Sequence, residues 1–425
     1  MNQTISYCQH GLKGEITIPA DKSISHRAVM FASLIKGKTL IKGFSKAQDP
    51  LSTVNVCKTL GVEIESINES DIVVTSSGIL KKHSQYLNCG NSGTTMRLMS
   101  GIVSSRNINC TLIGDESLSK RPMRRIIEPL TKMGAVIYTI DNCSPLYICG
   151  RNLHSINYHS QLASAQVKSC VLLAGLNAEG RTTFTEPSLS RNHTELLMSY
   201  LNADIKVDGL SVSVKRSQME PKTIEIPGDM SSAAFFIAAA LIVPHSDIIL
   251  KNVGLNPTRT GLLEVVSKMG GNVEILDKRI VCGETIGDLR VKYSELKGTV
   301  IEGDLIPKLI DEIPIIAVMA TQAEGTTIVR NAQDLRYKES DRISAVAGIL
   351  KKLGADITET SDGFIINGKC NLSGGVDVDS LWDHRLAMSA YIAGFLCKNE
   401  ILVRNFDCVD ISFPEFEQYI NYLHM

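Results

Sequence analysis

One pattern recurs six times along the chain and limits the folds that it can adopt. Each copy has an apolar helix rich in small residues, a turn with a short β-branched strand, a second amphipathic helix and another strand. The copies begin near residues 26, 95, 166, 231, 313 and 384. Roughly 70 residues separate them, with a longer step from the fourth to the fifth, which is too long for a solenoid repeat. We therefore predict an α/β protein made of six similar units.

The six units divide naturally into two groups of three. Pro227-Gly228 interrupts the chain between the third and fourth copies and predicts a domain boundary. We expect an N-terminal domain over residues 20–228 and a C-terminal domain over 1–19 and 229–425, with a hinge near 225–230. The opening strand precedes the first copy and can complete the sheet of the second half. The chain would then cross twice between the two domains. Two such crossings with a hinge would allow the domains to close over a cleft.

Composition excludes several classes of function. A net charge of -1 provides no basic field for nucleic acid or an anionic membrane, and 5% aromatic residues argue against a stacking platform. The longest apolar run, 233–243, is shorter than the ~18 residues of a membrane span and predicts a buried helix. The eleven cysteines have no ligand or disulfide spacing. We expect a cytoplasmic protein without a metal ion, a nucleic-acid partner or a membrane partner.

Small polar residues precede the apolar helices of the first half. Lys22, Ser23 and Arg27 gather at one helix start, expected near residue 24, where free N–H groups favour an anion. Gly93 lies in a second polar turn and lets a ligand approach the backbone closely. The alternative for both is ordinary capping, with Ser23 as an N-cap.

Further polar groups follow in the second and third copies. Arg121 lies beside a helix start in "KRPM", and Arg191 precedes a helix in "SRNHTE". The segment "ASAQVKS" opens a helix with Ser164, Gln166 and Lys168. Hydroxyl, amide and guanidinium groups suit a phosphorylated polyol, although each residue alone is more often a cap or a solvated side chain.

Carboxylates and cations alternate in the second half. Asp311 stands with Glu312 immediately before an apolar helix, as a cap or as a placed acid or base. Lys338 and Arg342 would share a face if their segment is helical, with Glu339 between them and a surface ion-pair run as the alternative. His384 and Arg385 open the last apolar helix.

Residues suited to binding an anion thus recur at the helix starts of nearly every copy. If the copies are alike in structure, these ends point into one cleft. The cleft would bind two phosphates and a carboxylate through seven cations: Lys22, Arg27, Arg121, Arg191, Lys338, Arg342 and Arg385.

The chain resembles the 5-enolpyruvylshikimate-3-phosphate synthase family over essentially its whole length. The strings that carry the resemblance are "DKSISHRA", "GNSGTTMR", "KRPM", "ASAQVKS", "SRNHTE", "GDMSSAAFF", "LRYKESDR", "DHRLAM" and "SFPEF". The resemblance implies two domains of three βαβαββ units each, an inside-out α/β barrel. It also implies enolpyruvyl transfer from phosphoenolpyruvate to the 5-hydroxyl of shikimate 3-phosphate, with release of phosphate through a tetrahedral intermediate, in chorismate and aromatic amino acid biosynthesis. It implies no cofactor.

The resemblance also assigns residues. Those implied to contact shikimate 3-phosphate are Lys22, Ser23, Arg27, Ser164, Ala165, Gln166, Arg191, Asp311, Asp334 and Lys338. Those implied to surround phosphoenolpyruvate are Lys22, Gly93, Arg121, Gln166, Lys338, Arg342 and Arg385. The catalytic residues would be Asp311, mainly as base, and Glu339, mainly as acid, with Lys22 as a rival for one role.

Some positions depart from the commonest form of the family. "ASAQVKS" with "SRNHTE" is typical of a second class that is often less sensitive to glyphosate, whereas Gly93 is the small residue of sensitive forms. Both responses to this inhibitor therefore stay open. Ile411 stands where many members have a lysine, and Asp334 where many have asparagine.

Two alternative functions share parts of this pattern. The related UDP-N-acetylglucosamine enolpyruvyl transferase normally carries a cysteine in the loop that here reads "GDESLSKRP". Ring-shaped DNA clamps also repeat α/β units, but they need no shared group of carboxylates and cations. We expect a stand-alone bacterial enzyme that is a monomer.

Overall fold

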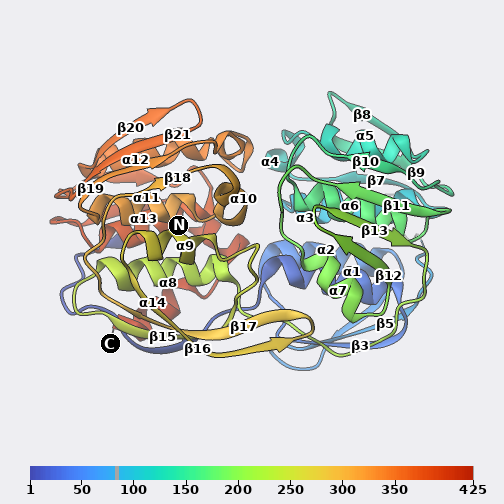
Figure 1. Cartoon of the computed structure of the whole chain (residues 1–425), viewed down its shortest axis with the longest axis horizontal. Coiled ribbons are helices and arrows are strands. Elements are labelled where there is room, and N and C mark those ends of the chain that lie inside the picture. The colour runs from blue at the N-terminus through green and yellow to red at the C-terminus, as the bar shows by residue number, and fades with distance from the viewer. Residues whose placement is uncertain (82–85, 425) are drawn as a thin grey trace. The chain divides into compact units, whose positions relative to one another are not determined.

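The structure, a computed structural model, describes residues 1–81 and 86–424 and divides into two compact units (Figure 1). The N-terminal unit comprises Ala20–Ile226 and Ile280–Glu284, and the C-terminal unit comprises Met1–Pro19, Pro227–Arg279 and Thr285–Met425. Residues 280–284 were expected in the C-terminal domain. They pack instead in the N-terminal unit, where the Glu284 carboxylate lies 2.6 Å from Nδ1 of buried His193.

The N-terminal unit has three four-stranded sheets, in the orders β14-β3-β5-β4, β6-β7-β9-β8 and β10-β11-β13-β12. Its strands are β3 (Lys36–Lys42), β4 (Glu63–Ser66), β5 (Ile72–Ser77), β6 (Tyr86–Asn88), β7 (Asn109–Ile113), β8 (Val136–Ile140), β9 (Cys143–Cys149), β10 (Asn157–His159), β11 (Arg181–Thr185), β12 (Asp204–Asp208), β13 (Ser211–Lys215) and β14 (Ile224–Glu225). Its helices are α1 (Lys22–Leu34), α2 (Gln48–Thr59), α3 (Gly93–Ser104), α4 (Glu116–Ser119), α5 (Arg124–Lys132), α6 (Ala165–Gly175) and α7 (His193–Tyr200).

The C-terminal unit has the sheets β16-β17-β15-β2, β18-β19-β21-β20 and β1-β23-β22. Its strands are β1 (Gln3–Ile5), β2 (Lys13–Thr17), β15 (Asp247–Gly254), β16 (Asn272–Val281), β17 (Glu284–Lys292), β18 (Val300–Ile301), β19 (Gly325–Val329), β20 (Asp356–Thr360), β21 (Gly363–Gly368), β22 (Asp377–Asp379) and β23 (Ile401–Arg404). Its helices are α8 (Met230–Ile242), α9 (Gly261–Lys268), α10 (Ile306–Leu309), α11 (Ile313–Gln322), α12 (Arg342–Leu353), α13 (His384–Gly394) and α14 (Phe416–His424), with 3-10 turns η1 (Gly303–Leu305), η2 (Gln333–Tyr337) and η3 (Phe406–Ile411).

The four-stranded sheets share one strand order, which confirms the predicted α/β repeat, whereas β1-β23-β22 has three strands. In β6-β7-β9-β8 the first two strands are parallel and the remaining neighbours are antiparallel. The same order recurs in β10-β11-β13-β12 and in β18-β19-β21-β20. The chain start fills the two sheets that would otherwise lack a strand, because β2 pairs with β15 and β1 pairs with β23. In the N-terminal unit, β14 likewise joins β3.

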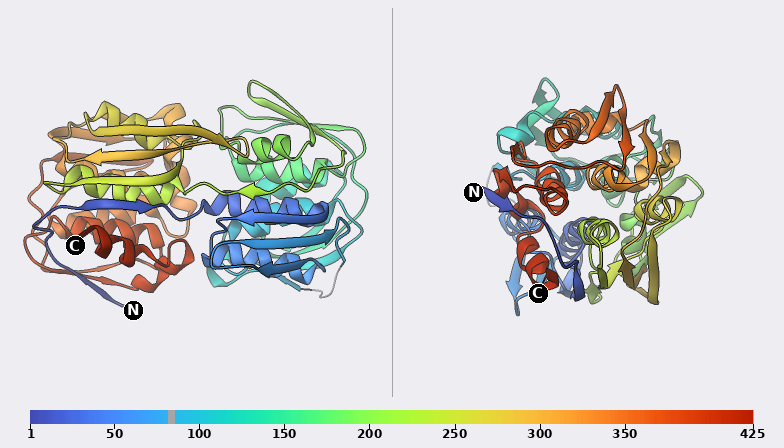
Figure 2. Two further views of the ribbon diagram at one scale, coloured as in Figure 1. Left: turned by 90° about the horizontal axis from the view of Figure 1, so that it is seen from below. Right: turned by 90° about the vertical axis from the view of Figure 1, so that its left-hand side faces the viewer.

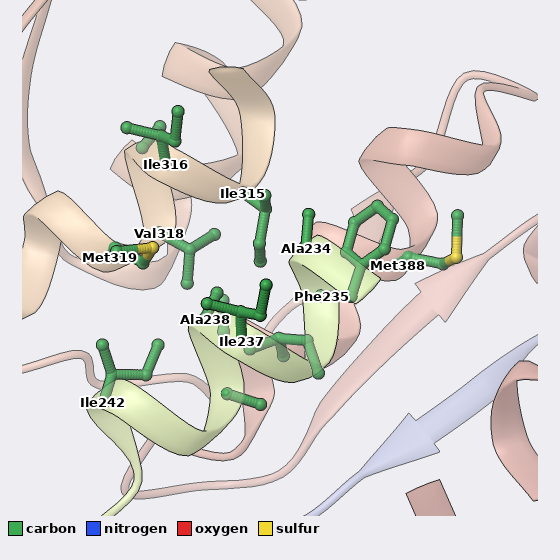
Figure 3. Packing of buried hydrophobic residues seen from close by; sticks show 14 of the residues in the cluster. Ala234, Phe235, Ile237, Ala238, Ile242, Ile315, Ile316, Val318, Met319 and Met388 are labelled. Atoms are coloured by element: carbon green, nitrogen blue, oxygen red, sulfur yellow. The ribbon is translucent and has the colours of Figure 1, made fainter. Parts of the chain in front are cut away.

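Helices form the inside of each unit and sheets form the outside (Figure 2). β13 alternates buried and half-exposed residues, as expected of a strand with one covered face. By contrast, α8 is buried at every residue, as its apolar sequence predicts. In the C-terminal unit α8 packs against α11 and α13, where Ile237, Ile315 and Met388 belong to one core (Figure 3).

The central helices α3 and α6 of the N-terminal unit pack at very short range. A Cβ added to Gly101 of α3 would collide with the backbone carbonyl of Cys170 in α6. Gly101 is therefore required by the closeness of the two backbones. This contact matters for function because the first turns of both helices carry predicted site residues.

We predict that Gly101→Ala lowers the free energy of unfolding by about 1–3 kcal/mol, because the added methyl overpacks the contact between α3 and α6. Gly348→Ala in α12 is the matched control, since a Cβ there meets no atom within 4 Å. The control should be neutral or stabilising by up to about 1 kcal/mol. Scanning calorimetry of both variants measures the difference, and equal melting temperatures would contradict the prediction.

Candidate active site

Three helices of the N-terminal unit begin at residues that the sequence singled out. Helix α1 begins at Lys22, α3 at Gly93 and α6 at Ala165. The caps are Asp21, Ser92 and Ser164, which accept hydrogen bonds from the backbone N–H groups of Ile24, Thr95 and Val167. Helix α1 begins two residues before the expected start near residue 24, and the alternative of Ser23 as its N-cap was wrong, because the Asp21 carboxylate caps the helix. Ser23 therefore lies in the first turn.

The first turns of α3 and α6 are joined by side chains. Arg97 Nη1 donates a 2.6 Å hydrogen bond to Gln166 Oε1, and Gln166 Nε2 donates to Thr94 Oγ1 at 3.0 Å. A Cβ on Gly93 would lie 3.0 Å from Arg97 Nη1 and 3.5 Å from Arg121 Nη1. The structure thus brings Gly93, Gln166 and Arg121 together. Sequence reasoning missed Arg97, although its place one turn after Gly93 in "GNSGTTMR" was a signal.

Arg27 is buried among the helix starts of the same unit. Its Nε donates to Thr194 Oγ1 at 2.7 Å, Nη1 donates to the carbonyl of Ser23 at 2.9 Å, and Nη2 donates to Ser169 Oγ at 2.9 Å. Burial lowers the pKa of Arg27 to about 10, which still leaves it protonated at neutral pH. The guanidinium is therefore a fixed positive charge held by neutral oxygens in these bonds.

Lys168, which the sequence grouped with Ser164 and Gln166, belongs to the interior of the N-terminal unit. Its ammonium lies 2.7 Å from carboxylate oxygens of both Glu186 and Glu195, and all three side chains are at most 4% exposed. Glu186 also accepts hydrogen bonds from the backbone N–H and hydroxyl of Ser190. The buried Glu186 carboxylate, held by Lys168, therefore orders the loop that leads to half-buried Arg191.

The C-terminal unit gathers carboxylates around one buried guanidinium. Arg342 donates to Asp383 through Nε at 2.8 Å and through Nη2 at 3.2 Å. Its Nη2 also lies 2.8 Å from Glu339 Oε2, and its Nη1 lies 3.4 Å from Asp311 Oδ1. Lys338 Nζ donates to the same Asp311 oxygen at 3.1 Å. Four predicted residues, Asp311, Lys338, Glu339 and Arg342, thus lie in one group, and the sequence did not identify Asp383.

The group does not form through a shared helical face, as the sequence suggested for Lys338 and Arg342. Asp341 caps α12 with its side chain on Ser344 N, so Lys338 lies in extended backbone before the helix. Asp311 brings the two cations together instead. Burial acts to lower the pKa of Arg342, but attraction from Asp383, Glu339 and Asp311 outweighs it and holds that pKa above the usual value.

Arg385 lies in the first turn of α13, where Asp383 caps the helix. Its Nη1 is 3.7 Å from Glu312 Oε1, and the Ser231 hydroxyl donates to the same carboxylate. Nη1 is buried and makes no hydrogen bond with any residue in the described ranges. A buried N–H donor without a hydrogen-bonded acceptor is costly, so this nitrogen is suited to receive an anionic ligand. Glu312 itself makes no side-chain cap to α11.

Asp334 and Ile411 are two further positions that the sequence singled out. Asp334 is half-buried in η2, the 3-10 turn that ends immediately before Lys338. Ile411 ends η3 and packs against the hydrophobic core of the C-terminal unit. Its side chain therefore serves packing.

Two structural features are absent from residues 1–81 and 86–424. No helix there has the length and hydropathy of a membrane span. No cluster of three or more His, Cys, Asp or Glu side chains there is arranged to hold a metal ion.

Comparison with known sequences identifies relatives along the whole chain. The sequence model of the EPSP synthase (3-phosphoshikimate 1-carboxyvinyltransferase) family matches residues 8–420. A 3-phosphoshikimate 1-carboxyvinyltransferase from Brevibacillus brevis is 49% identical over 414 residues, covering 96% of this chain and 97% of the relative. One from Bacillus licheniformis is 50% identical over 417 residues, with 97% of each chain covered.

Solved structures agree with the sequence comparison. An EPSP synthase from Acinetobacter baumannii superposes with a TM-score of 0.89 at 40% identity, covering 99% of this chain and 98% of that one. The enolpyruvyl transferase NikO from Streptomyces tendae shares the fold at 14% identity, with a TM-score of 0.78 and coverage of 99% and 97%. These likenesses confirm the two-domain, inside-out α/β fold that the sequence resemblance implied. The chain belongs to the EPSP synthase (3-phosphoshikimate 1-carboxyvinyltransferase) family of transferases.

Proposed function

We propose that the chain transfers the enolpyruvyl group of phosphoenolpyruvate to the 5-hydroxyl of shikimate 3-phosphate and releases phosphate, as a step of chorismate and aromatic amino acid biosynthesis. The observation that carries this proposal is the group around Arg342. It places two carboxylates, Asp311 and Glu339, beside two cations, Arg342 and Lys338. Cations bind the anionic substrates, and paired carboxylates exchange protons with them.

The reaction is an addition followed by an elimination. In the addition, a base takes the proton of the 5-hydroxyl, the oxygen attacks C2 of phosphoenolpyruvate, and an acid protonates the methylene carbon C3. The tetrahedral intermediate then loses a proton from C3, and the C2–O bond to phosphate breaks. We assign the base mainly to Asp311 and the acid mainly to Glu339, with Lys22 as a rival for one role.

Shikimate 3-phosphate is proposed to bind residues of both units. Hydroxyl, amide and guanidinium groups at the starts of α1 and α6 and before α7 suit its phosphate and ring hydroxyls. The proposed contacts are Lys22, Ser23, Arg27, Ser164, Ala165, Gln166 and Arg191 in the N-terminal unit, with Asp311, Asp334 and Lys338 in the C-terminal unit. The fixed charge of buried Arg27 supports a phosphate partner.

Phosphoenolpyruvate carries a phosphate and a carboxylate, and it needs several donors. Its proposed contacts are Lys22, Gly93, Arg121, Gln166, Lys338, Arg342 and Arg385. Gly93 supports this assignment because the absence of a Cβ leaves room beside Arg121. Arg385 supports it through its buried Nη1.

We further propose that the protein works as a monomer in the cytoplasm without a cofactor or metal ion. The enzyme can be either sensitive or tolerant to glyphosate, and both outcomes stay open. Titration of the inhibitor into the activity assay decides between them.

A phosphate-release assay tests the proposed activity directly. Purified protein should release phosphate from phosphoenolpyruvate only when shikimate 3-phosphate is present. Release with UDP-N-acetylglucosamine instead would assign the related transferase activity. No release with either acceptor would contradict enolpyruvyl transfer and leave the clamp-like alternative.

Glu339→Gln should lower kcat by about 10²-fold or more, because the amide cannot deliver a proton to C3. Glu359→Gln is the control: Glu359 also pairs with an arginine, Arg336, at 2.8 Å, but at an exposed site. The control should keep wild-type turnover in the same assay. Near-normal turnover of Glu339→Gln would remove the acid role from this residue.

Asp383→Asn should lower the free energy of unfolding by about 3 kcal/mol, because it removes a buried partner of the Arg342 charge. Asp341→Asn is the matched control, since Asp341 is also an N-cap paired with an arginine, but its side chain is 40% exposed. It should cost no more than about 1 kcal/mol. Chemical denaturation of both variants makes the comparison, and equal losses would contradict the structural role of Asp383.

A further inference from the structure

Helix α2 carries two polar side chains, one turn apart, that contact the starts of two other helices. The first is Asp49, whose Oδ2 accepts a 2.9 Å hydrogen bond from Lys22 Nζ at the start of α1. The two side chains are 13% and 19% exposed, so the ion pair is largely withdrawn from water. Asp49 therefore restrains the ammonium group of Lys22.

The second is Thr53, which lies in a buried chain of hydrogen bonds. Its hydroxyl is 2.6 Å from His26 Nδ1 in α1 and 2.7 Å from Thr95 Oγ1 in α3. Thr95 Oγ1 donates to Ser92 Oγ at 2.8 Å, and the same Ser92 oxygen caps α3 by accepting from Thr95 N. All four side chains are completely buried. The chain thus connects α1, through α2, to the cap of α3.

The direction of these bonds follows from their donors. Because Thr95 gives its hydroxyl proton to Ser92, Thr53 donates to Thr95, and His26 Nδ1–H donates to Thr53. Nε2 of His26 is then unprotonated, and it has no hydrogen-bond partner among the described residues. Burial, and then the charges of Lys22 and Arg27, lower the pKa of His26 well below its usual value, which agrees with a neutral ring.

The residues held in this way carry the proposed chemistry. Lys22 begins α1, and Gly93 follows Ser92 at the start of α3. In a buried chain each lost bond leaves a neighbour unsatisfied, so α1, α2 and α3 have little freedom to shift separately. Displacement of a binding group by about 1 Å can reduce a rate by about 10²-fold.

We propose that Asp49 and Thr53 are positioning residues for enolpyruvyl transfer, with α2 fixing Lys22 relative to Gly93. Neither residue needs to contact a substrate. The proposal rests on the function proposed above for Lys22 and Gly93. Helix α2 provides none of the proposed substrate contacts, so its proposed role in catalysis is indirect.

Thr53→Val tests the hydroxyl chain with almost no change of shape. It should lower kcat/KM by about tenfold or more, because His26 and Thr95 lose their shared partner. Thr53→Ser, which restores the hydroxyl, should recover most of the activity. Thr59→Val is the control on the same helix, because the Thr59 hydroxyl donates to the Asn55 carbonyl one turn earlier in α2 itself. This variant should match wild type.

Asp49→Asn tests the ion pair. It should raise the KM for shikimate 3-phosphate and lower kcat/KM by about tenfold, because the Lys22 ammonium loses the restraint of the Asp49 carboxylate. Asp208→Asn removes a carboxylate from the exposed end of β12 and should leave both constants unchanged. Calorimetric titration with shikimate 3-phosphate measures binding apart from turnover.

The outcomes separate this proposal from the proposed function. If wild type releases no phosphate with shikimate 3-phosphate, the function itself fails. If wild type is active and Thr53→Val and Asp49→Asn match it, the positioning role fails. The role also fails if Thr53→Ser is as impaired as Thr53→Val, since the lost activity would then follow the methyl group rather than the hydroxyl.

Discussion

The buried guanidinium of Arg342 is the interaction on which the C-terminal half of the site depends. A charge at 2% exposure is tolerated only when carboxylates surround it. Asp311, Glu339 and Asp383 supply them from segments that precede α11, α12 and α13. Satisfying one cation therefore holds three helix starts together, and two of the three carboxylates, Asp311 and Glu339, are the ones that we propose exchange protons with the substrates.

In the N-terminal unit, hydrogen bonds of hydroxyl and amide side chains join the central helices. Hydroxyls of Thr53 and Thr95 and the amide of Gln166 join the first turns of its central helices, and Gly101 lets two of those helices approach closely. Donors from neutral groups and fixed arginines suit an anion, whereas carboxylates such as Asp311 and Glu339 can also accept and deliver protons. The shared topology of the two units thus supports different chemistry through the residues at their helix starts.

Local features of the sequence predicted the repeats and the helix starts. Small polar residues before apolar runs identify the starts of α3 and α6 because capping is a short-range interaction. Long-range pairing leaves no such local signal. Lys168 lies in the same segment as the predicted site residues Ser164 and Gln166, yet its ammonium group pairs with Glu186 and Glu195 inside the core. The partnership of Arg342 with Asp383 was likewise hidden, since 41 residues separate them.

The proposed addition and elimination require that a solvent-exchangeable proton is delivered to carbon C3 of phosphoenolpyruvate and that a proton is then removed from it. Turnover in heavy water tests this most directly. A deuteron delivered in the addition gives a CH₂D group, and elimination removes one of its three hydrogen isotopes. The account predicts that mass spectrometry finds deuterium in the vinyl CH₂ of the enolpyruvyl product. Product formed in heavy water without deuterium at that carbon would contradict it.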